Sequence, residues 1–239
     1  MTPPDWAIPP PLYLDAEVLA FDKPAGLLTI PGRDLLAPSL WRLAEVTIGA
    51  RLWAVHRLDR ETSGVVIFAR TAVAHRALSM AFEQRLVQKR YLARVAPRPP
   101  SATAELLHRL VPARRGFMRL ARDGEGGQLA QTRYRVLAVS ANEALVELLP
   151  LTGRTHQLRL QLASMGSPIV GEPHYRACEE AHRQVADQPA PVSTEKGCRE
   201  SEPSRLWLHA HQLRLAHPLT AVALLIEAPP PTGLWSAAS

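Results

Sequence analysis

The chain has 239 residues, of which 46% are hydrophobic and 21% are charged, a balance that is ordinary for a globular protein with a sizeable core. Its two cysteines and the lack of any apolar run near ~18 residues exclude a disulfide scaffold and a membrane-spanning helix. The N-terminus has neither a basic segment nor an apolar segment of the kind found in secretion signals. We therefore expect a cytoplasmic protein with no membrane partner.

The basic residues are almost all arginines. The formal net charge is +6, and because lysine stands only at positions 23, 89 and 196, the other 25 of the 28 basic residues are arginines. Arginine binds phosphate bidentately and stacks on bases, so this excess favours a nucleic-acid partner. A genome rich in G and C raises the arginine content as well, so charge alone favours RNA or DNA only modestly.

The N-terminal part alternates short strands with punctuated loops. Residues 1–11 include five prolines and are predicted to form an extended arm, followed by one domain over 12–239. Two short strands are expected within 13–22, and two Pro and two Gly make 23–33 a loop of fixed shape. Ser39 is positioned to cap a helix over 40–48.

Residues 55–69 hold the first candidate functional group. A charged segment, H-R-L-D-R-E-T-S-G, runs directly into the apolar V-V-I-F-A, which is typical of a loop that leads into a buried strand. Asp59 lies in that loop between Arg57 and Arg60, and a nearby arginine stabilises an ionised carboxylate. Such an acid on a rigid loop has the properties of a nucleophile or general base. Structural ion pairs produce the same pattern, so the residues alone leave both interpretations open.

The middle of the chain indicates a helix, a strand and a basic segment. An amphipathic helix is predicted from Thr71 to about residue 86, and a strand over 88–95 places Lys89 and Tyr91 on one face. Residues 106–122 contain five arginines and no acid. Such clustering of one sign is typical of a nucleic-acid surface, but a solvated hairpin face is an equally good interpretation.

The C-terminal part completes an α+β pattern. A hairpin is expected from 131–140 and 144–149, and then a helix that Thr155 caps and that carries Arg159. A last pair of strands is expected over 206–216 and 222–228, and the polar, non-periodic residues 176–205 are predicted to be a flexible insertion. Strands outnumber helices and many are joined as hairpins, which favours α+β over a doubly wound sheet.

Four segments in this order resemble the RluA-type family of RNA pseudouridine synthases. They are K-P-A-G-L-L-T-I-P-G-R at 23–33, H-R-L-D-R-E-T-S-G at 56–64, Q-K-R-Y-L-A-R-V at 88–95 and L-T-G-R-T-H-Q-L-R-L-Q-L at 151–162. The resemblance spans about residues 21–228. It implies an α+β fold with a mixed, largely antiparallel central sheet divided by an RNA-binding cleft. It also implies an enzyme that isomerises specific uridines in structured RNA and uses no metal and no organic cofactor.

The resemblance also implies roles for single residues. Asp59 matches the catalytic aspartate, Tyr91 the tyrosine that packs against the target base, and Arg159 the arginine that forms a salt bridge with the aspartate, here expected to be bidentate. Arg57 matches an arginine near the flipped nucleotide. The full set of arginines expected to bind RNA is Arg57, Arg60, Arg109, Arg114, Arg115, Arg119 and Arg154.

The reaction explains these residue types but leaves details open. The bond from ribose to nitrogen 1 of uracil must break, and the ring must turn and rejoin through carbon 5. An ionised Asp59 can attack the sugar or base, or remove a ribose proton. Tyr91 supplies an aromatic wall, and its hydroxyl is a weaker candidate for removing the proton at carbon 5. His56 and His156 are candidates for acid–base groups, though a structural role is favoured.

Other functional classes remain as alternatives. A non-catalytic RNA-binding or ribosome-assembly factor would have the same fold, and it would be free to lose Asp59, Tyr91 or Arg159. A hydrolase with paired carboxylates is disfavoured because no second acid lies in a comparable motif. A zinc site is disfavoured because the spacing of the candidate ligands fits no standard site. These candidates are His174, Cys178, His182 and Cys198.

The compact form and the T-I-P-G-R ending of the first motif resemble the subgroup that modifies both ribosomal RNA and tRNA. This resemblance implies 23S-type ribosomal RNA, a tRNA anticodon stem-loop, or both as the substrate, and a monomeric enzyme. The stretch 176–205 departs from the compact members of the family, so substrate contacts after the fourth motif are left open.

Overall fold

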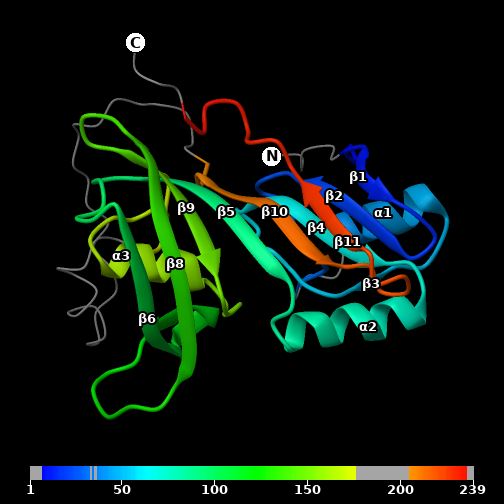
Figure 1. The fold of residues 1–239 in the computed structure, drawn as a ribbon, viewed down its shortest axis with the longest axis horizontal. Helices are drawn as coiled ribbons and strands as arrows, with labels where there is room; N and C mark the ends of the chain where they lie inside the picture. Colours follow the sequence, from blue (N-terminus) through cyan, green and yellow to red (C-terminus); the bar gives the residue numbers. More distant parts are fainter. Residues whose placement is uncertain (1–6, 33, 35–36, 176–204, 236–239) are drawn as a thin grey trace.

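A computed structural model describes residues 7–32, 34, 37–175 and 205–235, and within them one 11-stranded sheet forms the centre of the fold (Figure 1). The strand order is β1-β2-β4-β10-β5-β9-β8-β6-β7, with β3 paired to β4 and β11 to β10. The strands are β1 (Pro11–Leu14), β2 (Val18–Lys23), β3 (Trp53–Ala54), β4 (Ser63–Ala69), β5 (Gln88–Val95), β6 (Thr103–Pro112), β7 (Met118–Leu120), β8 (Gln128–Val139), β9 (Ala144–Pro150), β10 (Leu208–Ala216) and β11 (Ala223–Glu227).

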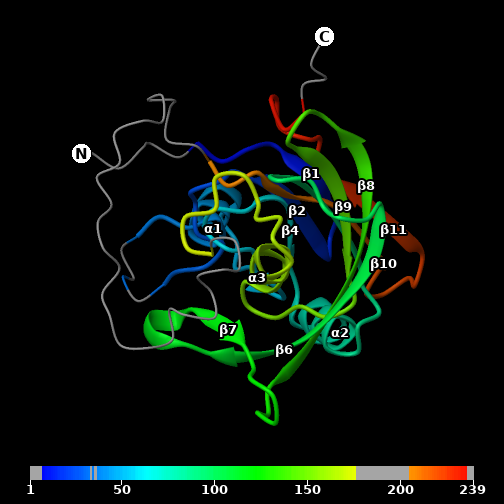
Figure 2. The ribbon, with the colours of Figure 1, turned by 90° about the vertical axis from the view of Figure 1, so that its left-hand side faces the viewer.

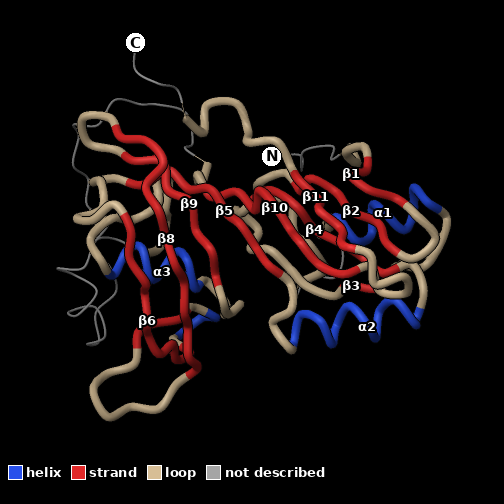
Figure 3. Tube along the Cα trace, in the orientation of Figure 1, coloured by secondary structure: helices blue, strands red, loops and turns tan. Residues whose placement is uncertain are grey.

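All strand pairs are antiparallel except β4 with β10, where Ser63 faces His209 and Gly64 faces Ala210. Gly64 has φ +114, and a Cβ atom there would overlap the backbone of Ala210. A glycine is therefore required where the two strands meet. The prediction of a mixed, largely antiparallel α+β fold is confirmed, and Figure 3 shows the strands as one continuous band.

The half of the sheet that contains β2, β4 and β10 is covered by two helices, α1 (Leu40–Ile48) and α2 (Ala72–Glu83) (Figure 1). Ser39 caps α1 as predicted, and Thr71, predicted as the first residue of the second helix, is the N-cap of α2; each side chain accepts a hydrogen bond from the first turn. The predicted end of α2 near residue 86 is wrong. Arg85 has φ 61, a left-handed conformation in which an α-helix cannot continue.

The other half of the sheet wraps around α3 (Gln157–Ser164), which lies against β6, β8 and β9 (Figure 2). Almost every residue of α3 is buried. Gln161 Nε2 donates to the carbonyls of Leu106 and Ala130, both at 3.1 Å, which satisfies a buried polar group and fixes the helix on the sheet.

Some sequence predictions fail or lie outside the structure. Thr155 is not the N-cap of α3, because the helix begins at Gln157 after His156, which has φ 53 and makes no side-chain capping bond. Pro11, predicted as part of the arm, opens the edge strand β1. The proposed insertion at 176–205 lies almost wholly outside the described residues. No described helix is long and apolar enough to cross a membrane.

Acid is expected to destabilise the fold, because His209 is buried and its imidazole is held neutral. Burial lowers the pKa of His209 to about 4, whereas an unfolded histidine titrates near 6.5. Below about pH 6.5 the unfolded chain therefore binds a proton that the folded chain does not. The free energy of unfolding should fall by roughly 1–2 kcal/mol from this group between pH 7 and pH 5, as measured by urea unfolding. His209→Gln should reduce this dependence, and equal stability at both pH values would contradict the prediction.

Candidate active site

A cavity of about 630 Å³ lies where the segment before β4, the end of α2, strand β5 and the segment before α3 meet. The residues that line it include Arg57, Asp59, Lys89, Tyr91, Arg154 and Arg159. The structure therefore brings together the three predicted catalytic residues. They come from three of the four sequence motifs.

Asp59 reaches the cavity with its carboxylate one-fifth exposed (21%). Oδ2 lies 3.5 Å from Nη1 of Arg159, and Oδ1 lies 3.9 Å from Nε2 of His156. Among the described residues, Arg159 is the charged partner of Asp59, and the His156 imidazole is its other close neighbour. The neighbouring arginines do not form an ion pair with Asp59, contrary to the sequence prediction. Arg60 Nε donates to the carbonyl of Gly26 at 2.9 Å, and Arg57 is exposed at the cavity.

Arg159 forms its bidentate contact with Glu172 rather than with Asp59. Nε and Nη2 each lie 2.7 Å from a carboxylate oxygen of Glu172, while Nη1 faces Asp59 at 3.5 Å and Glu61 at 3.7 Å. The expectation of a bidentate contact with Asp59 is therefore wrong. Burial by itself lowers the pKa of Arg159, but the hydrogen bonds and charge of Glu172, together with the other two acids, raise it overall. The guanidinium is charged and held fixed.

Glu172 is the main residue of this site that the sequence analysis missed. Its side chain is 2% exposed, and Oε1 also accepts the backbone N–H groups of His174 at 3.0 Å and Tyr175 at 3.3 Å. The Tyr175 ring lies 5.6 Å from the Arg159 guanidinium, and its hydroxyl is 2.7 Å from Nδ1 of His156. The one available signal was indirect: a buried arginine needs an acid nearby.

Tyr91 lies on β5 and packs against two hydrophobic clusters of the core. Its hydroxyl makes no hydrogen bond with any described residue, and burial, followed by the charge of Asp59, raises the pKa of the phenol. The side chain is therefore neutral in the free protein. Its ring presents an aromatic wall to the cavity.

The first motif fixes the loop that carries Asp59. Lys23 is fully buried, and its Nζ donates to the carbonyls of Pro24 at 2.9 Å, Leu27 at 2.7 Å and Arg60 at 3.1 Å. Burial lowers the pKa of this lysine to about 7. Lys23 therefore links the loop of the first motif to the loop that carries Asp59. The last residue of this motif, Arg33, lies outside the described residues.

The two candidate histidines differ. Nε2 of His56 accepts the N–H of Ile67 at 3.0 Å, and its ring stacks on Phe82 at 4.7 Å. Burial lowers the pKa of His56 to about 3, so it is a neutral group that orients the loop, as favoured from the sequence. His156 lies beside Asp59, and burial lowers its pKa as well.

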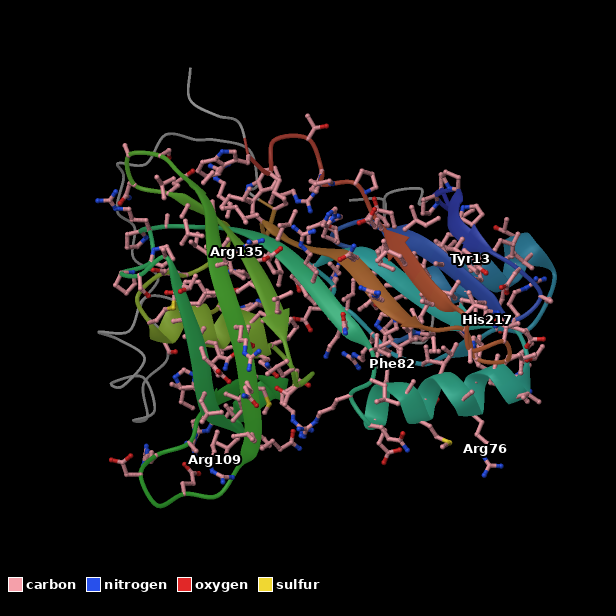
Figure 4. All side chains as sticks on the ribbon, in the orientation of Figure 1. Tyr13, Arg76, Phe82, Arg109, Arg135 and His217 are labelled. Atoms are coloured by element: carbon pink, nitrogen blue, oxygen red, sulfur yellow. The ribbon has the colours of Figure 1, made fainter. Side chains whose placement is uncertain are left out.

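The arginines expected to bind RNA fall in separate places. Arg57 and Arg154 line the cavity. Arg109 lies on β6, in the half of the sheet that wraps around α3 (Figure 4), and donates to the carbonyl of Gly127 at 3.0 Å. Arg119 pairs with Glu125 through two contacts of 2.7 Å. Glu125 lies just beyond the acid-free stretch 106–122. Arg114 is exposed, and the side chain of Arg115 lies outside the described part.

The candidate zinc ligands are not brought together in the part of the chain that the structure describes. Cys178, His182 and Cys198 lie outside it, and the ring of His174 packs on Phe117 at 4.6 Å. No group of three or more metal-ligating side chains occurs among the described residues.

Comparison with known proteins identifies the family. Residues 17–164 match the family model described as RNA pseudouridylate synthase. The chain is 34% identical to the dual-specificity RNA pseudouridine synthase RluA of Escherichia coli, over 91% of each chain. It is 36% identical to an uncharacterised RNA pseudouridine synthase of Zymomonas mobilis, over 91% of this chain and 94% of the relative.

Solved structures agree. The human protein RNA pseudouridylate synthase domain containing 4 superposes with a TM-score of 0.71 at 30% identity, covering 94% of this chain and 89% of that one. Human RNA pseudouridylate synthase domain containing 1 shares the fold, with a TM-score of 0.70. This chain belongs to the RluA-type family of RNA pseudouridine synthases, isomerases that convert uridine in RNA to pseudouridine.

Proposed function

We propose that Asp59 is the carboxylate with which this enzyme isomerises uridine, in the cavity that it shares with Tyr91 and Arg159. One observation carries the proposal. The carboxylate is accessible from the cavity, yet it lies beside an arginine whose other two nitrogens are bound to Glu172. Arg159 therefore faces Asp59 through a single long contact of 3.5 Å. The carboxylate oxygens remain able to react, as a nucleophile or a base must.

The rest of the cavity suits a base that is detached and turned. The uracil must rotate without leaving the site after its bond to the ribose breaks, and the Tyr91 ring provides a wall for this step. Because the phenol is neutral in the free protein, it begins the reaction as a packing surface and a hydrogen-bond donor. The carboxylate either attacks the nucleotide or removes a ribose proton, and the geometry is compatible with both.

RNA must present the uridine outside its stack, which costs a few kcal/mol. Stacking on an aromatic side chain gives about 1–3 kcal/mol per base, and contacts with phosphates add to this. Arg57 and Arg154 at the cavity and Arg109 on β6 are positioned to supply such contacts. Arg119 is engaged by Glu125, so it contributes only if RNA displaces that carboxylate.

We further propose structured RNA of two kinds as substrate, large-subunit ribosomal RNA and the anticodon stem-loop of tRNA. Support comes from 34% identity over nearly the whole length to a relative named as a dual-specificity enzyme. Base readout in RNA concentrates on loops whose bases are splayed out, which both kinds of RNA offer.

The proposal is tested by mapping pseudouridine in ribosomal RNA and tRNA from three strains: wild type, a deletion of this gene, and the deletion complemented with Asp59→Ala. We expect specific sites to disappear in the deletion and to remain absent with Asp59→Ala. Complementation with the wild-type gene is the control. Restoration of the sites by Asp59→Ala would contradict the catalytic role, and an unchanged map with disturbed ribosome assembly would favour a binding factor.

A further inference from the structure

Part of the cavity is lined by cations that have no acidic partner. Arg85 follows α2, Lys89 lies on β5, and Arg154 belongs to the segment before α3, and all three line the cavity. We call these three residues the cation cluster. Among the described residues, no ion pair joins any of them to a carboxylate. Like charges close together repel one another, so their grouping favours an anion between them.

The ammonium group of Lys89 has N–H donors that form no hydrogen bond with a described residue. Its Nζ makes one hydrogen bond, to the carbonyl of Thr152 at 3.0 Å, out of the three that an ammonium group can donate. A Cβ atom on Gly153 would lie 3.3 Å from this nitrogen, so the glycine leaves room around it. Burial, followed by the charges of Arg85 and Arg154, lowers the pKa of Lys89 to about 8. The positive charges of Arg85 and Arg154 therefore act on the Lys89 ammonium.

The other two members also have donors available. Arg85 follows α2 with φ 61, the left-handed conformation in which helices commonly end. Its side chain lines the cavity and makes no hydrogen bond to a described residue. Arg154 uses Nε for the carbonyl of Leu129 at 3.3 Å. Its terminal nitrogens have no hydrogen bond to a described residue.

The cluster lies close to the proposed position of the uracil. Lys89 and Tyr91 are two residues apart on β5, so their side chains leave the same face of the strand roughly 7 Å apart. An anion held at Lys89 would therefore be adjacent to a base packed on Tyr91. In RNA, the group of that charge next to a base is a backbone phosphate.

We propose that the cation cluster binds a phosphodiester group of the RNA next to the uridine that Tyr91 holds. This site rests on the proposed function, because it requires a nucleotide in the cavity. Each phosphate that a protein cation neutralises releases counterions, so the contact contributes to the salt dependence of binding. Lys89 must be protonated to contribute.

RNA affinity should therefore fall as the pH rises from 7 to 9. The charged or titratable groups around Lys89 are Arg85 and Glu83 at the end of α2, Arg154 before α3, and His56 before β4. Arginine side chains in general stay charged over this range, and His56, with a pKa of about 3, stays neutral. Lys23, with a pKa of about 7, does titrate nearby, so the effect must be assigned through variants of Lys89.

The experiment measures binding of bulk tRNA to the whole chain by fluorescence anisotropy, at several salt concentrations and at pH 7 and pH 9. For Lys89→Gln we expect about three- to tenfold weaker binding at pH 7, and a slope of log affinity against log salt that is smaller by about one. The weakening from pH 7 to pH 9 should largely disappear. The control is Arg76→Gln, which removes one charge from the outer side of α2, where Arg76 points away from the sheet (Figure 4).

The proposal is overturned if Lys89→Gln has the affinity and salt slope of Arg76→Gln. Should Lys89→Gln not fold, Lys89→Arg decides. Loss of the pH dependence in that variant supports the site, because arginine stays charged at pH 9, and an unchanged pH dependence overturns it. Asp59→Ala is assayed for pseudouridine formation in parallel. Activity in Asp59→Ala refutes the proposed function, whereas an inactive Asp59→Ala with unaffected Lys89 variants refutes the phosphate site alone.

Discussion

Replacing Asp59 by asparagine is expected to abolish pseudouridine formation, by at least about 10⁴-fold in the single-turnover rate. The amide has nearly the same size as the carboxylate, and its oxygen can still accept a hydrogen bond from Arg159. It cannot act as a nucleophile or as a base at neutral pH, so the chemical step should fail while the site keeps its shape. The release of tritium from carbon 5 of labelled uridine in the RNA measures the rate directly.

The position of Asp59 allows this loss to be separated from weak binding or misfolding. The bidentate pair of Arg159 with Glu172 does not involve Asp59, so the buried charges stay paired in Asp59→Asn and the stability should change little. RNA affinity should stay within about twofold, because one uncharged side chain replaces a carboxylate that would repel phosphate. The matched control is Asp123→Asn, because Asp123 is an exposed acid between β7 and β8. Substantial product from Asp59→Asn would rule out the carboxylate as the reacting group.

The elements that the sequence predicted well depend on local signals. Ser39 caps the N-terminus of α1, and Gly49, in a left-handed conformation, ends the helix. Both residues act within one turn of the helix. Strand β5 matched its predicted bounds because alternation and charge mark it directly. The motif residues Asp59, Tyr91 and Arg159 were found because a family resemblance carried them, and the structure then placed them around one cavity.

The features that the sequence did not reveal depend on distant partners. The parallel pairing of β4 with β10 joins residues more than 140 positions apart, and no local pattern encodes it. Glu172 was missed for the same reason: it follows α3 in a segment without periodicity, and its role appears only once Arg159 is known to be buried. Glu125 pairs with Arg119 from outside the acid-free window, so a charge count within that window overestimated the free positive surface.

Arg159→Met is expected to reduce both the stability and the rate. The side chain is 1% exposed and faces three carboxylates, so its removal leaves Glu172 buried without a partner. Loss of one member of a buried ion pair typically costs 3–5 kcal/mol, and urea unfolding should show a decrease of about that size. The rate should fall by about 10²–10³-fold. Arg94→Met is the control, because Arg94 forms a similar two-nitrogen contact with Glu143 at 2.7 and 3.1 Å away from the cavity.

The double variant Arg159→Met/Glu172→Gln separates the two effects. Removing the carboxylate as well eliminates the unpaired buried charge, so part of the lost stability should return. Activity should not return, because Asp59 still lacks the guanidinium that faces it at 3.5 Å. If the double variant recovered the rate together with the stability, Arg159 would serve the fold alone. If the rate stayed low in a stable protein, the contact of 3.5 Å between Arg159 and Asp59 would be part of the chemistry.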